Sequence, residues 1–224
     1  MEWGPQFAEA LHALATHAPH SGASLATTLP AVAENKLLRY LELLAKWNKV
    51  FNLTAITDPA RMLTHHLLDS LAVAAPIDAI VAGKDHPQLL DVGSGAGLPG
   101  IPLAIARPGW SMTLLDSNGK KTAFVQQAAV ELELANVQVV TSRAETHLGL
   151  YDVILSRAFS TLRDFVRKTE PLLVPGGCWA AMKGAIPPDE VANLPESVRC
   201  AQAIPLRVPG LDAQRHLLIL RRAA

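Results

Sequence analysis

An acidic residue followed by three alternating glycines is the pattern with the most chemical content in this sequence. Asp91 ends an apolar run, and Gly93, Gly95 and Gly97 follow it at every second position. Glycines at the end of a strand let the chain turn tightly into a helix, so that a ligand can approach the backbone and its N–H groups. The pattern predicts a site for a nucleotide-like cofactor.

The spacing of the glycines separates two classes of nucleotide site. The dinucleotide fingerprint Gly-x-Gly-x-x-Gly would place its last glycine at position 98, where this chain has Leu98. A pyrophosphate-binding loop is therefore disfavoured, which argues against a dinucleotide-dependent oxidoreductase. A tight turn with a purely structural role is the alternative that the glycines leave open.

A second acidic residue ends the next apolar run. Asp116 follows Met-Thr-Leu-Leu (112–115), where a carboxylate can accept both hydroxyls of a ribose. The alternative is a helix N-cap, since Asp116, Ser117 and Asn118 all lie beside the start of the next helical segment.

The spacing of apolar residues predicts the strands and helices that position these residues. Short apolar runs at 88–93, 111–116, 137–141, 151–156 and 177–184 alternate with helical segments at 99–107, 118–134 and 161–170. This alternation is typical of a parallel sheet covered on both faces. Two further runs, 199–208 and 215–222, are joined by a short link that suits an antiparallel pair.

The chain before residue 82 has a helical pattern. Leu37, Leu41 and Leu44 recur at helical spacing within 34–52, which predicts an amphipathic helix. A second long helix is expected to begin after a cap at Thr57 or Asp58 and to stop at Pro76. We therefore expect a helical cap over 1–82 and an α/β domain over 83–224, packed as one globular unit.

Composition limits the function classes. The chain has 224 residues, half of them apolar, no net charge and two cysteines. No apolar run reaches membrane length, and the N-terminal residues lack the pattern of a signal peptide, so a cytoplasmic protein without a membrane partner is expected. Net charge alone indicates no nucleic-acid partner, so any basic surface has to be created by folding.

The loop and the second-strand acid together resemble the S-adenosylmethionine-dependent methyltransferases of the Rossmann-like class I. The C-terminal antiparallel pair resembles the hairpin that closes their mostly parallel seven-stranded sheet. Further blocks are similar to those of the bacterial RsmG (GidB) family in order and spacing. These blocks are WNKVFNLTAI, HHLLDSL, DVGSGAGLPGIPLAI, LLDSNGKK, SRAE, SRAF and MKG, between about residues 46 and 184.

The resemblance implies an activity, a cofactor and a set of site residues. The family methylates N7 of a guanine in the 530 loop of 16S rRNA, with S-adenosylmethionine as cofactor and free 16S rRNA, an assembling particle or the 30S subunit as substrate. Together with the loop pattern, it nominates these cofactor-binding residues: Asp91, Gly93, Ser94, Gly95, Gly97, Leu98, Asp116, Ser117, Ala144, Glu145 and Arg157. Ordinary surface roles remain the alternatives for Glu145, as a solvated carboxylate, and for Arg157, as an ion pair with Asp152 or Asp164.

The chemistry of the acceptor can also be argued from residues. Ser156-Arg157-Ala158-Phe159 occupies the place where enzymes that methylate exocyclic amines commonly carry Asn/Asp-Pro-Pro-aromatic. Cys178 lies inside an apolar run, which is unfavourable for the nucleophile that cytosine C5 chemistry needs. Guanine N7 has an in-plane lone pair and no hydrogen, so its methylation needs positioning rather than a general base. Arg157 is the candidate positioning residue, and no catalytic base is assigned.

Cations at the expected site edge are candidates for binding RNA. Lys120, Lys121, Arg157 and Lys183 follow three different strands, and His65 occupies a position that is usually Arg or Lys in the family. An ordinary solvated pair is the alternative for Lys120 and Lys121. His65, His66 and Asp69 share a helix without a third ligand at metal spacing, so no metal is expected and a helix-face hydrogen bond or a contact with the α/β domain is favoured. A monomer is expected.

Three function classes follow from these residues. The first is an rRNA methyltransferase, the second is a Rossmann oxidoreductase, which the glycine spacing disfavours, and the third is a cofactor-binding ribosome-associated protein without catalysis.

Overall fold

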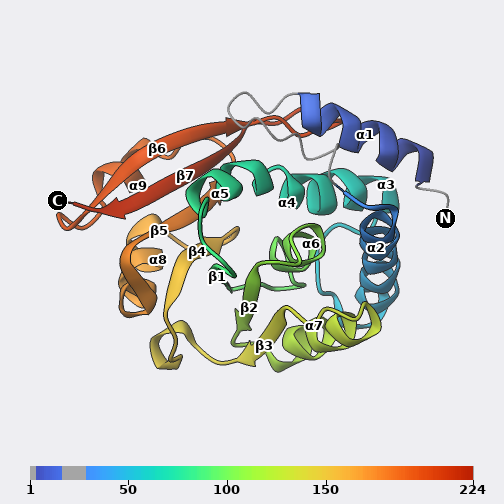
Figure 1. Ribbon diagram of the computed structural model, residues 1–224, viewed down its shortest axis with the longest axis horizontal. Coiled ribbons are helices and arrows are strands. Elements are labelled where there is room, and N and C mark those ends of the chain that lie inside the picture. The colour runs from blue at the N-terminus through green and yellow to red at the C-terminus, as the bar shows by residue number, and fades with distance from the viewer. Residues whose placement is uncertain (1–3, 17–28, 224) are drawn as a thin grey trace.

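A seven-stranded sheet forms the centre of the molecule (Figure 1). The structure is a computed structural model, and it describes residues 4–16 and 29–223. The strands are β1 (Gln88–Val92), β2 (Ser111–Asp116), β3 (Val137–Thr141), β4 (Tyr151–Ser156), β5 (Leu173–Lys183), β6 (Val198–Leu206) and β7 (Arg215–Arg222). The α-helices are α1 (Gly4–Thr16), α2 (Ala31–Phe51), α3 (Pro59–Met62), α4 (Asp69–Leu71), α5 (Ala74–Ile80), α6 (Gly100–Ala106), α7 (Gly119–Glu131), α8 (Leu162–Thr169) and α9 (Pro188–Ala192). A π-helix, η2 (Leu63–Leu68), and two 3₁₀ turns, η3 (Ala144–Thr146) and η4 (Glu170–Leu172), complete the secondary structure of these ranges.

The strand order is β3-β2-β1-β4-β5-β7-β6. The five strands from β3 to β5 are parallel, and β7 pairs antiparallel with both β5 and β6. The Rossmann-like sheet predicted from the sequence, with its antiparallel C-terminal pair, is confirmed. From β1 the chain adds β2 and β3 on one side, and from β4 it adds β5 on the other side. The loops after the neighbouring parallel strands β1 and β4 therefore lead in opposite directions and leave a site at the carboxyl ends of these strands.

Alternate residues of the central strands lie in two separate apolar cores. Leu89 and Val153, which are neighbours in the register, belong to the larger core, whereas Leu90, Ile154 and Trp179 belong to the smaller one. Helices α2, α6 and α7 contribute to the larger core, and α8 covers the other face. Both faces are therefore buried, which explains why the strands are almost continuously apolar.

The helical region before the sheet differs from its prediction in one respect. Helix α2 forms over Ala31–Phe51, and Asp58 rather than Thr57 caps α3, accepting a hydrogen bond from the N–H of Ala60 at 3.1 Å. The predicted end at Pro76 is wrong: the helical stretch runs without a gap through α3, η2 and α4 to Leu71, a turn follows at 72–73, and α5 is a separate helix. Pro76 lies in the first turn of α5, where its missing N–H leaves no helical hydrogen bond unmade.

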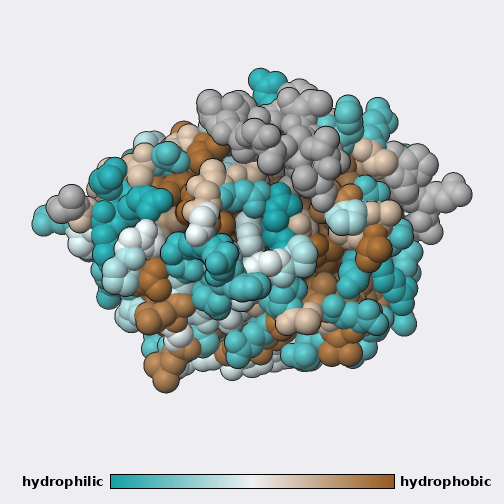
Figure 2. Space-filling model, viewed as in Figure 1, coloured by the Kyte–Doolittle hydropathy of each residue, from teal (hydrophilic) through white to brown (hydrophobic). Residues whose placement is uncertain are grey.

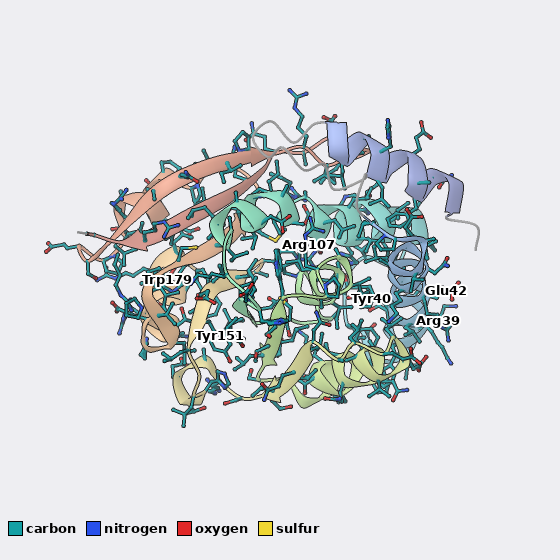
Figure 3. All side chains as sticks on the ribbon, viewed as in Figure 1. Arg39, Tyr40, Glu42, Arg107, Tyr151 and Trp179 are labelled. Atoms are coloured by element: carbon teal, nitrogen blue, oxygen red, sulfur yellow. The ribbon has the colours of Figure 1, made fainter. Side chains whose placement is uncertain are left out.

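The α2 and α5 helices are tied to the sheet-side helices. The Trp47 ring lies 5.5 Å from that of Phe124 on α7, and Arg107 after α6 makes three hydrogen bonds of 2.6–3.0 Å to Asp78 on α5. Figure 3 shows Tyr40 beside α2 and Arg107 nearer the centre of the view. The larger core is continuous across residue 82, and the division of the chain at that residue stays a prediction.

The surface seen in Figure 2 mixes hydrophilic residues with separate hydrophobic patches. Large exposed hydrophobic side chains are likewise spread over several elements: Val32, Val50, Phe51, Val130, Leu148, Leu150 and Ile186. Isolated exposed apolar residues are normal on globular proteins, and we give them no role. Among the described residues, no helix is both long and apolar enough to cross a membrane.

Gly97→Ala is expected to destabilise the fold. A Cβ at Gly97 would lie 2.7 Å from Cγ1 of Ile101, and the backbone φ of +86° is unfavourable for alanine. Overpacking and backbone strain together predict a loss of about 2–4 kcal/mol in the free energy of unfolding, measurable by urea denaturation. Gly83→Ala is the matched control, because Gly83 has a φ of +81° but no atom within 4 Å of the added Cβ. Equal losses in the two variants would contradict the packing role of Gly97.

Candidate cofactor and substrate site

The loop between β1 and α6 leaves open space over two of its three alternating glycines. Gly93 and Gly95 have φ values of +70° and +59°. A Cβ at Gly93 would meet no atom within 4 Å, and one at Gly95 would meet only the carbonyl oxygen of Gly93 at 3.9 Å. Gly97, by contrast, is buried against Ile101. The first two glycines border a space that a ligand can enter, whereas the third is required by its packing against Ile101 and by its positive φ.

Most N–H groups of this loop are turned inward. Five of them donate to acceptors within the protein: those of Gly93, Ser94, Gly95, Gly97 and Leu98. The acceptors are the carbonyl oxygens of Leu115 and Ser94 and the carboxylate of Asp116. The expectation that these N–H groups face a ligand is wrong, because the tight turn brings acceptors of the protein itself within reach. The loop therefore offers space rather than a cradle of donors for a pyrophosphate.

Asp116 joins the two loops that follow β1 and β2. Its Oδ2 accepts from the N–H of Gly95 at 2.9 Å, and its Oδ1 accepts from the N–H of Asn118 at 2.8 Å. The cap of α7 is Asn118, whose Oδ1 accepts from the N–H groups of Lys120 and Lys121. Since a carboxylate offers about four lone pairs, Asp116 can still accept hydrogen bonds from a ligand.

Asp91 lies beneath the loop and is fully buried. Its Oδ2 accepts from the N–H of Gly100 at 2.8 Å, while its buried Oδ1 has no partner in the structure. Burial raises the pKa of Asp91 to about 7, although the Gly100 hydrogen bond and the positive charge of Arg157 lower it. Gly100 is a site residue that sequence reasoning missed: a Cβ there would lie 2.8 Å from Asp91 Oδ2 and 2.7 Å from Leu114.

Asp91→Asn is expected to flatten the pH dependence of stability. The folded-state pKa of Asp91, about 7, is higher than the usual value of 3.8, so the folded protein binds this proton more tightly than the unfolded chain. The free energy of unfolding should therefore fall as the pH rises from about 4 to about 7, by a few kcal/mol as an order of magnitude.

Urea denaturation of the wild type and of Asp91→Asn between pH 4 and 8 measures this effect. The asparagine keeps an acceptor for the N–H of Gly100 and does not titrate, so the difference between the two proteins should grow in favour of the variant across that range. A difference that does not change with pH would contradict the raised pKa.

Arg157 follows β4 and extends to the helical region. Its Nη1 donates to the carbonyl oxygen of His65 at 3.1 Å and lies 3.7 Å from Oδ2 of Asp69. The ion pairs with Asp152 or Asp164 that the sequence left open do not form: Asp152 pairs with Lys84 at 3.1 Å, and Asp164 accepts from the hydroxyl of Ser160. Asp69 therefore contacts the sheet region, as favoured from the sequence.

The other candidate cations differ in how far they are already paired. The Nζ of Lys183, at the end of β5, lies 2.9 and 3.1 Å from the two carboxylate oxygens of Glu190. Lys120 is exposed and Lys121 half-buried, and neither has an ion pair among the described residues. The ring of His65 contacts its own helical region, with Nδ1 at 3.1 Å from the carbonyl oxygen of Arg61. Lys120 and Lys121 are the candidates with the fewest competing contacts.

The remaining candidate residues differ in how far they are exposed. Ala144 is buried in the smaller core, and Glu145 beside it is exposed, with its carboxylate 3.4 Å from Lys168. Ser117 is exposed, whereas the side chain of Leu98 is buried in the larger core. The exposed Ser117 and Glu145 can reach a ligand through their side chains, and Leu98 can do so only through its backbone.

A polar side chain from the helical region also reaches the loop, and sequence reasoning missed it. The hydroxyl of Tyr40 donates to the carbonyl oxygen of Ala96 at 2.6 Å, which ties α2 to the glycine loop. His66 is buried with Nε2 at 2.9 Å from the hydroxyl of Thr54, and burial lowers its pKa to about 4. The available signal for Tyr40 was its place three residues after Leu37 on the apolar face of the predicted helix.

Buried polar atoms without partners mark the same region. These atoms are Oδ1 of Asp91, Oγ of Ser94, Oγ of Ser156 and Nδ1 of His66. Such atoms are rare in folded proteins and indicate a place where another group can complete the hydrogen bonding. Within 4–16 and 29–223, no group of three or more His, Cys, Asp or Glu residues could hold a metal ion.

Solved structures with this architecture are distant in sequence. Similar structures include TrmN from Thermus thermophilus, with a TM-score of 0.54 and 18% identity, covering 72% of this chain and 53% of that chain. A methyltransferase from Thiobacillus denitrificans in complex with S-adenosyl-L-homocysteine gives a TM-score of 0.51 and 13% identity, covering 67% of this chain and 90% of that chain. These likenesses show the Rossmann-like fold.

Sequence relatives are much closer. A protein of Laribacter hongkongensis named ribosomal RNA small subunit methyltransferase G is 54% identical over 200 residues, 88% of this chain and 93% of that protein. A protein of the same name from Neisseria meningitidis serogroup A is 49% identical over 201 residues, 89% of this chain and 94% of its own length. The family model GidB, described as rRNA small subunit methyltransferase G, matches residues 33–218. This chain therefore belongs to the GidB family of rRNA small subunit methyltransferases.

Proposed function

We propose that this enzyme transfers a methyl group from S-adenosylmethionine to N7 of a guanine in the 530 loop of 16S rRNA. The observation that carries the proposal is the open space over Gly93 and Gly95 beside the Asp116 carboxylate, in a chain of the GidB family. This space lies at the carboxyl ends of β1 and β2, where open parallel sheets bind their ligands.

The residues around this space fit the cofactor. Asp116 would accept hydrogen bonds from the ribose hydroxyls, and the missing side chains of Gly93 and Gly95 would let the nucleoside lie against the backbone. Ala144 and Glu145 would border the adenine. When bound, S-adenosylmethionine supplies a methyl group on a positively charged sulfur. The inward N–H groups of the loop favour this ligand over a dinucleotide, whose pyrophosphate would need those donors.

The groups around the site also suit an acceptor that needs no deprotonation. Guanidinium groups have donors only, so Arg157 can contact guanine O6, a phosphate or the cofactor carboxylate but would block N7 if it bonded there. Burial raises the pKa of Cys178 to about 11, which is unfavourable for a nucleophilic thiolate. The chain would act chiefly by holding the purine and the methyl donor in line.

The RNA would be held by single cations rather than by net charge. Lys120 and Lys121 begin α7 beside Asp116, so they would contact phosphates near the cofactor. Lys183 would have to leave Glu190 before contacting RNA, and the ring of His65 already contacts the carbonyl oxygen of Arg61. A ribosomal substrate would place the enzyme in the cytoplasm.

The test is transfer of tritiated methyl groups to purified small subunits and to free 16S rRNA. We expect incorporation into 16S rRNA, mapped to one guanine of the 530 loop by cleavage chemistry that detects N7-methylguanosine. Incorporation into another RNA or into protein would refute the substrate. Tight binding of S-adenosylmethionine without transfer to either substrate would favour a binding protein, and tight binding of NADH would favour the oxidoreductase.

A further inference from the structure

A buried carboxylate holds two arginines from distant parts of the sheet region. Asp69, at the start of α4, is 3% exposed. Its Oδ1 accepts from Nε of Arg215 at 2.9 Å, and its Oδ2 lies 3.7 Å from Nη1 of Arg157. Arg215 begins β7 and Arg157 follows β4, so one carboxylate joins the helical region to two strand ends.

The π-helix before Asp69 supplies a second contact for Arg157. The N–H of Asp69 bonds to the carbonyl oxygens of Thr64 and His66 and bypasses that of His65 between them. The carbonyl oxygen of His65 instead accepts from Nη1 of Arg157 at 3.1 Å. In a regular α-helix the N–H of Asp69 would bond to this carbonyl. Short π-helical turns of this kind are frequent at functional sites.

Arg157 is thereby held close to the glycine loop. Burial is the largest influence on the pKa values of Tyr40, His66 and Asp91, and the positive charge of Arg157 lowers all three. Tyr40 bonds to the glycine loop, and Asp91 lies beneath it. The guanidinium is therefore near the carboxyl ends of both β1 and β4, between which the strand order reverses.

We infer that Asp69, anchored by Arg215, and the bypassed carbonyl of His65 form a positioning device for Arg157. The inference rests on the proposed function, in which Arg157 contacts the cofactor or the purine. Asp69 and Arg215 act through Arg157 and touch neither ligand. With the device intact, the guanidinium is ordered before either ligand arrives, so binding does not have to order it.

A second, partly buried ion pair provides the matched control. Arg107 and Asp78 join α6 to α5 through three hydrogen bonds, so this pair also links two helical elements. Because α6 starts at the glycine loop and runs back along the sheet, Arg107 at its far end lies at the opposite edge from the site. A purely structural ion pair should behave like this one.

The test is a double-mutant cycle on turnover with small subunits. Asp69→Asn should lower kcat about tenfold or more, and Asp78→Asn should leave it within twofold of the wild type. In an Arg157→Ala background, Asp69→Asn should change kcat less than twofold, because its effect passes through Arg157. Multiplicative losses in the double variant would overturn the inference. Arg215→Lys, which keeps the charge but not the Nε–H, should lower kcat in the same direction and provides the test if Asp69→Asn does not fold.

A readout without cofactor or RNA separates this inference from the proposed function. ¹⁵N relaxation of the protein alone gives the order parameter of each arginine Nε–H bond. The order parameter of Arg157 should be high in the wild type and lower in Asp69→Asn, and that of Arg107 should be the same in both proteins. An Arg157 signal that is equally ordered in both proteins would overturn the device. A wild type that shows this ordering but methylates no rRNA would instead refute the proposed function.

Discussion

A Gly95→Val protein is expected to fold and to lose its affinity for S-adenosylmethionine. The added Cβ would meet no protein atom closer than the carbonyl oxygen of Gly93 at 3.9 Å, so the side chain would extend into the open space over the loop. A branched side chain there would occupy the volume proposed for the nucleoside. We expect binding to weaken at least a hundredfold, measured by calorimetry.

The effect of backbone strain on stability has to be separated from the effect of the filled space on binding. The φ of +59° at Gly95 is unfavourable for valine, so the variant should also lose some stability. Gly83→Val is the matched control, because Gly83 has a φ of +81° and no neighbour within 4 Å but lies in the loop before β1. It should show a similar loss of stability and normal binding. Normal affinity in folded Gly95→Val would refute the position of the cofactor.

Arg157→Ala is expected to lower methyl transfer with a small effect on stability. The substitution removes the donor to the His65 carbonyl, while Asp69 keeps its 2.9 Å hydrogen bond from Arg215 and so is not left as an unpaired buried charge. Loss of a residue that positions reacting groups can cost about a hundredfold, and we expect kcat/KM for small subunits to fall by that order.

Arg107→Ala serves as the control for the removal of a half-buried arginine. It breaks three hydrogen bonds to Asp78, so it should lower the melting temperature at least as much as Arg157→Ala does. Its turnover should remain near that of the wild type, because it lies away from the site. If Arg157→Ala has normal turnover and normal RNA affinity, Arg157 does not belong to the site.

The ionised carboxylate of Asp91 lowers the stability of the fold, but its hydrogen bond shapes the glycine loop. A fully buried carboxylate with one unpartnered oxygen is unfavourable when ionised, and burial accordingly raises its pKa. Yet its position under the loop, bonded to the N–H of Gly100, fixes the point at which β1 turns into α6. The proposed site therefore requires a group that destabilises the free protein at neutral pH.

The sheet and the location of the loop could be predicted from sequence, because both depend on local patterns. Apolar runs of strand length alternate with helical periods, and only a covered parallel sheet buries runs that are apolar on both faces. The Asp-x-Gly-x-Gly pattern likewise reports a turn that the backbone makes within a few residues. Hence the mostly parallel seven-stranded sheet and its C-terminal antiparallel pair agree with expectation.

The failed predictions concern contacts between distant residues. The π-helical turn over Leu63–Leu68 includes a carbonyl of His65 that accepts from Arg157, 92 residues further along the chain. Similarly, the inward N–H groups of the loop depend in part on acceptors from β2, the carbonyl oxygen of Leu115 and the carboxylate of Asp116.

The sequence by itself determined where the strands lie, apart from the first four residues of β5, where the glycine loop lies and which family the chain resembles. Only the tertiary structure decided that Gly93 and Gly95 border open space while Gly97 is packed, and that Asp69 holds two arginines. The physical reason is range: hydrophobic periodicity and turn chemistry act over neighbouring residues, whereas free space and charge pairing depend on which distant side chains the completed fold brings together.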